Sequence, residues 1–191
     1  IHRGSDIIGR TGVEIEHPAT SIRRLAEKRG AERVPIPHGL NHGDLNSRNV
    51  LLDDRLSIRL IDFYKSGFGF ILLDYARLEA DIRFEGLAVE PDYLAELRWM
   101  NDQLAQATTL AAIRAIDARR SLARRLDLAL TLRTLAVDLL GLEERPTLEL
   151  YAAALLIVLS RLLKHRHLTP EATDLVLAEM NSLAERLLNR R

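Results

Sequence analysis

The stretch HGDLNSRNVLLDD, residues 42–54, carries three aspartates, two asparagines and one histidine. It ends in a short apolar run, and a second such run, SIRLIDF at 57–63, follows the turn-forming residues DDR. Two short apolar runs separated by turn residues are typical of a β-hairpin. The sequence therefore predicts a hairpin with Asn49 at the start of its first strand and Asp62 at the end of its second.

Strand pairing would bring the oxygen-bearing side chains together. An antiparallel hairpin returns Asp62 to the neighbourhood of Asn49, with Asp44 on the loop just before the first strand. A carboxylate beside an amide oxygen suits Mg²⁺, which usually also binds substrate phosphates. The spacing Asp-x4-Asn, followed by a strand that ends in Asp-Phe, is the layout of a kinase site in which the first aspartate accepts a hydroxyl proton.

Two other interpretations of these residues stay open. Asp and Asn side chains commonly bind backbone groups in turns, so the set can be purely structural, and Asp53 and Asp54 are best explained in this way. Alternatively, a Mg²⁺-dependent hydrolase would use Asp44, Asn49 and Asp62 on a water molecule. The residue types and their spacing do not separate such a hydrolase from a slow kinase.

The segment resembles the catalytic region of aminoglycoside phosphotransferase-like kinases. The matching positions are His42-Gly43-Asp44-Leu45, Asn49, Ile61-Asp62-Phe63, and Gly69 followed by Asp74 and Ala76. Asn46 stands where those kinases usually have a second histidine. With the run DYARLEAD at 74–81, the segment is more similar to the kinase-like, ternary-complex-associated domains of bacterial signalling or defence proteins.

The resemblance implies a role for each matching residue. Asp44 would be the catalytic base, with His42 as a second candidate catalytic residue. Asn49 and Asp62 would bind Mg²⁺ and, through it, ATP, while Asp74 and His42 would brace the catalytic loop. The implied substrates are a nucleotide and a hydroxyl-bearing acceptor, either a small molecule or a protein. The alternative is an inactive kinase-like module that binds protein partners.

The implied fold is α+β and mainly α: a protein-kinase-like C-terminal lobe with a catalytic loop and β-hairpin followed by a helical bundle. A kinase also needs a glycine-rich loop and a strand lysine paired with a helix glutamate. None of the three lysines, Lys28, Lys65 and Lys164, has such a strand context. Because the chain also starts at Ile1, we expect a piece of a longer protein, with its N-terminal lobe elsewhere and little activity from this piece alone. The alternative is a variant that has lost its nucleotide clamp.

The composition narrows the classes of protein to which this chain can belong. Hydrophobic residues make up 47 % of the 191 residues and charged residues 28 %, which suits a folded core. Basic and acidic residues number 27 each, which argues against a nucleic-acid binder. The absence of cysteine excludes disulfides and Cys-ligated zinc and is compatible with the cytoplasm, the compartment we expect. The longest apolar run, 150–159, is about half of a membrane span, so we expect no membrane partner.

The patterns divide the chain into three regions. Residues 1–33 form a connecting segment with one helix at 19–30, capped by Thr20 or Ser21. Residues 34–90 form the core of catalytic loop and metal-binding hairpin, with loops at 31–41 and 65–70 and a helix at 72–84. Residues 91–191 form a helical subdomain, with helical spacing over 110–141 and a last helix that begins after Thr169.

Overall fold

Helices make up most of the molecule in a computed structural model, which describes residues 7–8, 14–15, 17–84, 87, 90–164 and 168–189. The helices are α1 (Pro18–Arg29), α2 (Leu72–Phe84), α3 (Pro91–Gln106), α4 (Leu110–Arg114), α5 (Arg120–Leu140), α6 (Glu144–Leu162) and α7 (Pro170–Leu188). Small antiparallel sheets accompany them. This confirms the predicted mainly helical α+β class.

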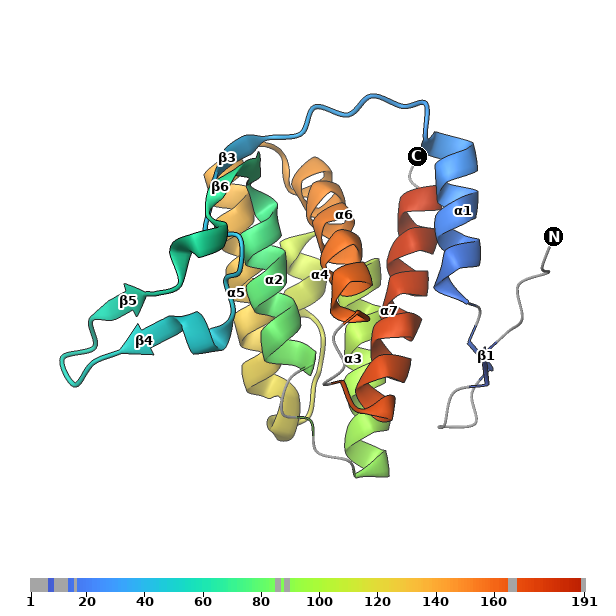
Figure 1. The fold of residues 1–191 in the computed structure, drawn as a ribbon. Helices are drawn as coiled ribbons and strands as arrows, with labels where there is room; N and C mark the ends of the chain where they lie inside the picture. Colours follow the sequence, from blue (N-terminus) through green and yellow to red (C-terminus); the bar gives the residue numbers. More distant parts are fainter. Residues whose placement is uncertain are drawn as a thin grey trace.

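The helices pack as a bundle around α6 and α7 (Figure 1). Helix α7 contacts α1, α3 and α6, and helix α2 contacts α5 and α6. Leucine and methionine side chains fill the space between them, and Leu97, Met100, Leu104, Leu155 and Leu159 are completely inaccessible or nearly so. Burial of such side chains contributes about 1.5–3 kcal/mol each, so the bundle supplies most of the stability that holds the smaller elements in place.

Helix boundaries follow the predicted signals in part. Thr169 caps α7, because its hydroxyl accepts a hydrogen bond from the Ala172 amide. The cap of α1 is His17 rather than Thr20 or Ser21, since the helix already begins at Pro18. The helical spacing over 110–141 is interrupted between α4 and α5, where the amide of Arg119 donates to Glu96 Oε1 at 2.7 Å.

A cluster of charged side chains lies inside the bundle. Arg133 forms a two-pronged contact with Glu79, with Nε–Oε2 and Nη2–Oε1 distances of 3.1 and 2.8 Å, and its Nη1 donates to the carbonyl of Leu104. Arg83 also contacts Glu79, and it donates to Glu179 Oε1 at 2.5 Å. Each of these charges is buried, so each depends on its partners for the solvation that water would otherwise supply.

The strands form three two-stranded antiparallel sheets within the described residues. They are β1 (Ile7–Ile8) with β2 (Glu14–Ile15), β3 (His38–Asn41) with β6 (Gly67–Phe70), and β4 (Val50–Leu52) with β5 (Ile58–Leu60). The β4–β5 pair confirms the predicted hairpin. The prediction of loops through 31–41 and 65–70 was wrong at β3 and β6, because the glycines that indicate a loop here lie opposite each other in a ladder, Gly39 with Gly69.

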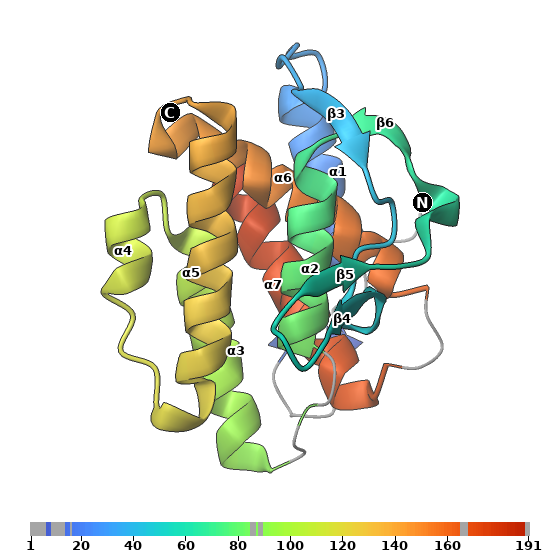
Figure 2. The same ribbon diagram turned by 90° about the vertical axis from the view of Figure 1, so that its left-hand side faces the viewer.

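The two strand pairs β3–β6 and β4–β5 lie at the edge of the bundle. The chain crosses one end of the bundle from α1 to β3, and the β4–β5 hairpin projects away from the helices (Figure 1). Seen from that side, the hairpin faces the viewer and β3–β6 lies beyond one end of α2 (Figure 2). Residues 42–49 lie between the hairpin and α2, because His42 contacts the Ile61 carbonyl and carboxylates of α2 accept amides of this segment. None of the described helices is long and apolar enough to span a bilayer.

Candidate functional site

The hairpin brings Asn49 and Asp62 to one end of the two strands. Val50 pairs with Leu60, and the amide of Ile61 donates to the carbonyl of Asn49 at 3.1 Å. Asp62 is the next residue, so it follows directly on the last contact with Asn49. Backbone hydrogen bonds between the two strands therefore bring these two residues close together.

Asp62 has an unusual backbone conformation. Its φ of 64° and ψ of 56° lie in the left-handed region, which few residues other than glycine adopt. The side chain is exposed, and its carboxylate has no hydrogen-bond or ion-pair partner among the residues that the structure describes. A carboxylate held on a strained backbone and left without a protein partner is available for a cation.

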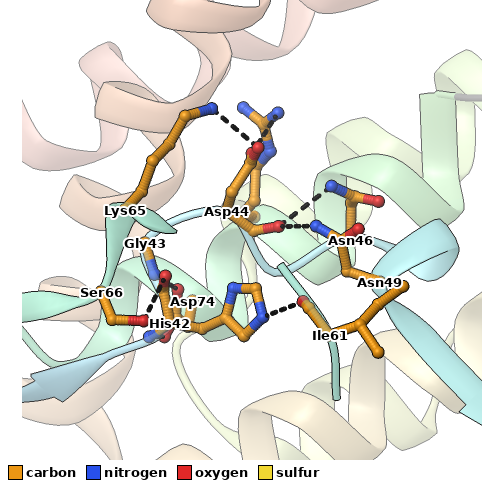
Figure 3. A network of polar contacts seen from close by, with 10 residues as sticks. His42, Gly43, Asp44, Asn46, Asn49, Ile61, Lys65, Ser66 and Asp74 are labelled. Atoms are coloured by element: carbon orange, nitrogen blue, oxygen red, sulfur yellow. Dashed lines mark hydrogen bonds and ion pairs between the residues drawn. The ribbon is translucent and has the colours of Figure 1, made fainter. Parts of the chain in front are cut away.

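Two asparagines hold the loop that carries Asp44. Asn49 Nδ2 and Asn46 Nδ2 both donate to the backbone carbonyl of Asp44, at 2.9 and 3.0 Å (Figure 3). The Asn46 oxygen accepts a further bond from the Arg48 amide. Since Asn49 uses its nitrogen in this contact, its Oδ1 is left as the atom that can face a ligand.

His42 links the loop to the end of the hairpin. Its side chain is buried, with Nε2 lying 2.8 Å from the carbonyl of Ile61 and its ring 4.6 Å from that of Phe63. Because a carbonyl only accepts, Nε2 carries the proton in this contact and cannot act as a base there. The geometry supports the bracing role of His42 more than the catalytic one.

Asp74 holds the loop from the first turn of α2. Its carboxylate accepts the amides of both His42, at 2.5 Å, and Gly43, at 3.0 Å (Figure 3). Both oxygens are used, so Asp74 holds the loop backbone and has little capacity left for a metal. Gly43 has a φ of 83°, which lets the chain turn directly after His42.

Asp44 is held by two cations. Lys65 Nζ lies 2.7 Å from Asp44 Oδ2 (Figure 3). The Nη2 atom of Arg77 lies 3.1 Å from Asp44 Oδ1. Partial burial opposes ionisation, but the hydrogen bond from Lys65 and the charges of Arg77 and Lys65 outweigh it, so the pKa of Asp44 is lowered. The carboxylate therefore stays ionised through the neutral range and is fixed in orientation.

Sequence reasoning missed the side chains that reach the loop from its surroundings. Besides Lys65 and Arg77, Asp81 contributes by accepting the amide of Ser47 at 2.7 Å. Asp74, Arg77 and Asp81 lie at intervals of three and four along α2, so they share one helix face. That spacing was the available signal: three charged residues on a face that would otherwise be apolar indicate a face packed against a polar loop.

Comparison with known proteins matches the chain to the model of one family. A family model described as ternary complex associated domain 9 matches residues 2–164 of the chain. No curated protein matches, and no solved structure matches. The match covers the loop that carries Asp44, the hairpin and helices α1 to α6. The chain therefore belongs to the ternary complex associated domain 9 family.

Proposed function

We propose that this chain is the catalytic lobe of an ATP- and Mg²⁺-dependent phosphotransferase that acts on a hydroxyl group of a small molecule or a protein. The observation that carries the proposal is the end of the β4–β5 hairpin. Asn49 and Asp62 are brought there by strand register, while Asp44 is fixed beside them by the side chain of Asn49. This arrangement supports phosphoryl transfer because it unites two metal-binding oxygens with a carboxylate that can orient a hydroxyl.

The donor set fits Mg²⁺. Asn49 Oδ1 and the Asp62 carboxylate are hard oxygens, and neither has a partner in the described part of the chain. Among the described residues there is no group of three or more His, Cys, Asp or Glu side chains placed to hold a metal. Mg²⁺ needs no such cluster, since it typically uses one or two protein carboxylates and completes its shell with waters and phosphate oxygens. When bound, it would neutralise charge on the phosphates.

Asp44 would act mainly by orienting the acceptor. Its lowered pKa makes it a weak base, but an ionised carboxylate can still accept a hydrogen bond from the incoming hydroxyl. In a loose phosphoryl-transfer transition state, positioning matters more than early proton removal. Asp74 and His42 would keep Asp44 in place through the loop backbone and the end of β5.

The nucleotide clamp of a kinase is not provided by the residues that the structure describes. Described residues before the catalytic loop form α1, an extended crossing and the short strands β1 to β3. A glycine-rich loop with a strand lysine is not among them. We expect binding of ATP by this chain alone to be weak and to depend on the metal.

A second candidate function is a kinase-like interaction module in a bacterial signalling or defence assembly, without catalysis. The observation in its favour is a set of exposed apolar side chains on the strand pairs β3–β6 and β4–β5 and on the segments beside them. They are Val34, Ile36, Leu40, Leu51, Leu52, Leu56, Ile58, Leu60, Ile61, Phe63, Tyr64 and Phe68. Exposed apolar patches of this kind commonly mark protein interfaces, and the family description, ternary complex associated, fits an assembly role.

Calorimetric titration of MgATP separates the two candidates. We expect millimolar binding that disappears when EDTA removes the metal, and no detectable binding for Asp62→Asn, because the substitution removes the charged metal ligand. Asp54→Asn is the matched control, since Asp54 lies on the same hairpin in its turn and should leave binding unchanged. Absence of Mg²⁺-dependent heat at millimolar nucleotide would contradict the phosphotransferase and favour the interaction module.

A further inference from the structure

Two cations from different elements converge on one carboxylate. Lys65 is the last residue of the short 3-10 helix η2 (Phe63–Lys65), and Arg77 lies in the middle of α2. They bind opposite oxygens of Asp44, at 2.7 and 3.1 Å. Two positive charges face one negative charge in this three-residue cluster, so one of the cations is available to pair with a further anion.

The two cations differ in how far their side chains are exposed to solvent. The side chain of Lys65 is 44 % exposed, whereas that of Arg77 is 24 % exposed and that of Asp44 only 19 %. Lys65 also follows Asp62 by three residues, on the same turn that presents the proposed metal ligand. The more exposed ammonium group of Lys65 can change partner with less disturbance of the fold than the more buried guanidinium group of Arg77.

We propose that Lys65 is a phosphate-binding residue that exchanges Asp44 for a terminal phosphate oxygen when the nucleotide binds. This inference rests on the proposed function and names the group that would supply, from within this chain, positive charge toward the transferred phosphoryl group. Arg77 stays on Asp44 and keeps that carboxylate ionised and oriented. Lysine suits such a role because its ammonium group is a compact charge on a flexible stem.

The exchange gives each group a defined place in the reaction. The acceptor oxygen forms a bond to the terminal phosphorus, and the bond from that phosphorus to the bridging oxygen breaks, so that ADP leaves. The hydroxyl proton passes to Asp44, on the oxygen that Lys65 has released. Lys65 keeps its proton throughout and offsets the charge that remains on the phosphoryl oxygens.

The test uses sodium tripolyphosphate without Mg²⁺ as the probe, because it reports the cation alone and not the metal site. Calorimetric titration is expected to show about tenfold weaker binding for Lys65→Ala than for the unchanged chain, the usual scale of one charge-assisted contact. Lys28→Ala is the matched control, since Lys28 is an exposed lysine on α1 and should have no effect.

The variant Asp44→Asn distinguishes exchange from a fixed ion pair. If Lys65 must leave Asp44 to bind phosphate, removing the carboxylate charge should tighten tripolyphosphate binding severalfold, and adding Lys65→Ala should remove that gain. A fixed structural pair predicts instead that Lys65→Ala has no effect while Asp44 is present and weakens tripolyphosphate binding only in the Asp44→Asn background, and that result overturns the inference.

Failure of the inference is distinguishable from failure of the proposed function. If MgATP binding depends on Asp62 but is the same for Lys65→Ala, the metal site stands and Lys65 has no phosphate role. If MgATP does not bind but tripolyphosphate binds in a Lys65-dependent way, the anion site stands without phosphotransfer. If neither probe binds, both proposals are overturned.

Discussion

Replacing Arg133 with methionine is expected to lower the free energy of unfolding by about 3–5 kcal/mol, the scale for removing one partner of a buried ion pair. Arg133 is 2 % exposed and holds both oxygens of Glu79 as well as the carbonyl of Leu104. Without it, the ion pair that remains to Glu79 among the described residues is the one with Arg83, at 3.2 Å. The loss arises from a charge that remains buried with too few partners, since methionine fills much of the volume of the arginine side chain.

Urea denaturation followed by circular dichroism measures this loss, and Arg124→Met on the same helix is the matched control. Arg124 is exposed, so its replacement should change the free energy of unfolding by less than about 0.5 kcal/mol.

The ionised state of Glu79 also makes the free energy of unfolding depend on pH. Burial raises the pKa of Glu79, but the charges of Arg133 and Arg83 outweigh it, so the pKa is lowered. The stabilisation by this pairing is therefore present at neutral pH and is lost as the pH falls through the lowered value.

A loss below about 1 kcal/mol for Arg133→Met would contradict this account of the cluster. The double variant Arg133→Met with Glu79→Leu gives a further check. It removes both charges of the pair, so it should be more stable than Arg133→Met alone if an uncompensated carboxylate causes the loss. Glu179 and Arg83 remain paired in that variant.

Gly43→Ala is expected to destabilise the loop by about 1–3 kcal/mol and to abolish Mg²⁺-dependent nucleotide binding. Gly43 has a φ of 83°, and a Cβ atom added there would fall on the backbone carbonyl oxygen of Lys65. A backbone atom cannot rotate away, so the loop must shift. The shift would break the contact of the Gly43 amide with Asp74 and displace Asp44 from Lys65.

Gly67→Ala is the control for this substitution. Gly67 lies in β6 without a positive φ, and a Cβ atom added there meets no atom within 4 Å. Denaturation and MgATP titration of both variants measure the contrast. Normal nucleotide binding by Gly43→Ala would mean that the loop conformation is not needed for the site, which the proposed mechanism does not allow.

Local patterns predicted the parts of the fold that local interactions determine. The helix at 72–84 was placed correctly because its apolar residues repeat at helical intervals, and the hairpin because turn-forming residues separate two short apolar runs. Strands β3 and β6 were missed because their pairing joins residues 38–41 to residues 67–70, far apart in the chain. No local pattern marks such a partner, and the glycines in both strands favour a loop on their own.

The candidate site was predictable to a similar extent. The positions of Asn49 and Asp62 followed from the hairpin. The left-handed backbone of Asp62 did not, because Asp adopts this region more often than most residues but its spacing does not mark where. The pairing of Lys65 and Arg77 with Asp44 depends on how η2 and α2 meet the loop, which spacing cannot give. Glu79 and Arg83 likewise resemble an exposed i, i+4 pair in the sequence and are buried only because α2 lies inside the bundle.

Paramagnetic line broadening in NMR spectra tests the central claim most directly, because it locates the nucleotide-bound metal even when binding is weak. Mn²⁺ replaces Mg²⁺, and spectra with MnATP are compared with spectra containing the Mn²⁺–EDTA complex. The account predicts that MnATP selectively broadens the amide signals of Asn49 and residues 61–63, and leaves those of α3 and α7 sharp. Broadening centred elsewhere, or none at millimolar MnATP, would contradict a nucleotide-metal site at the end of the hairpin.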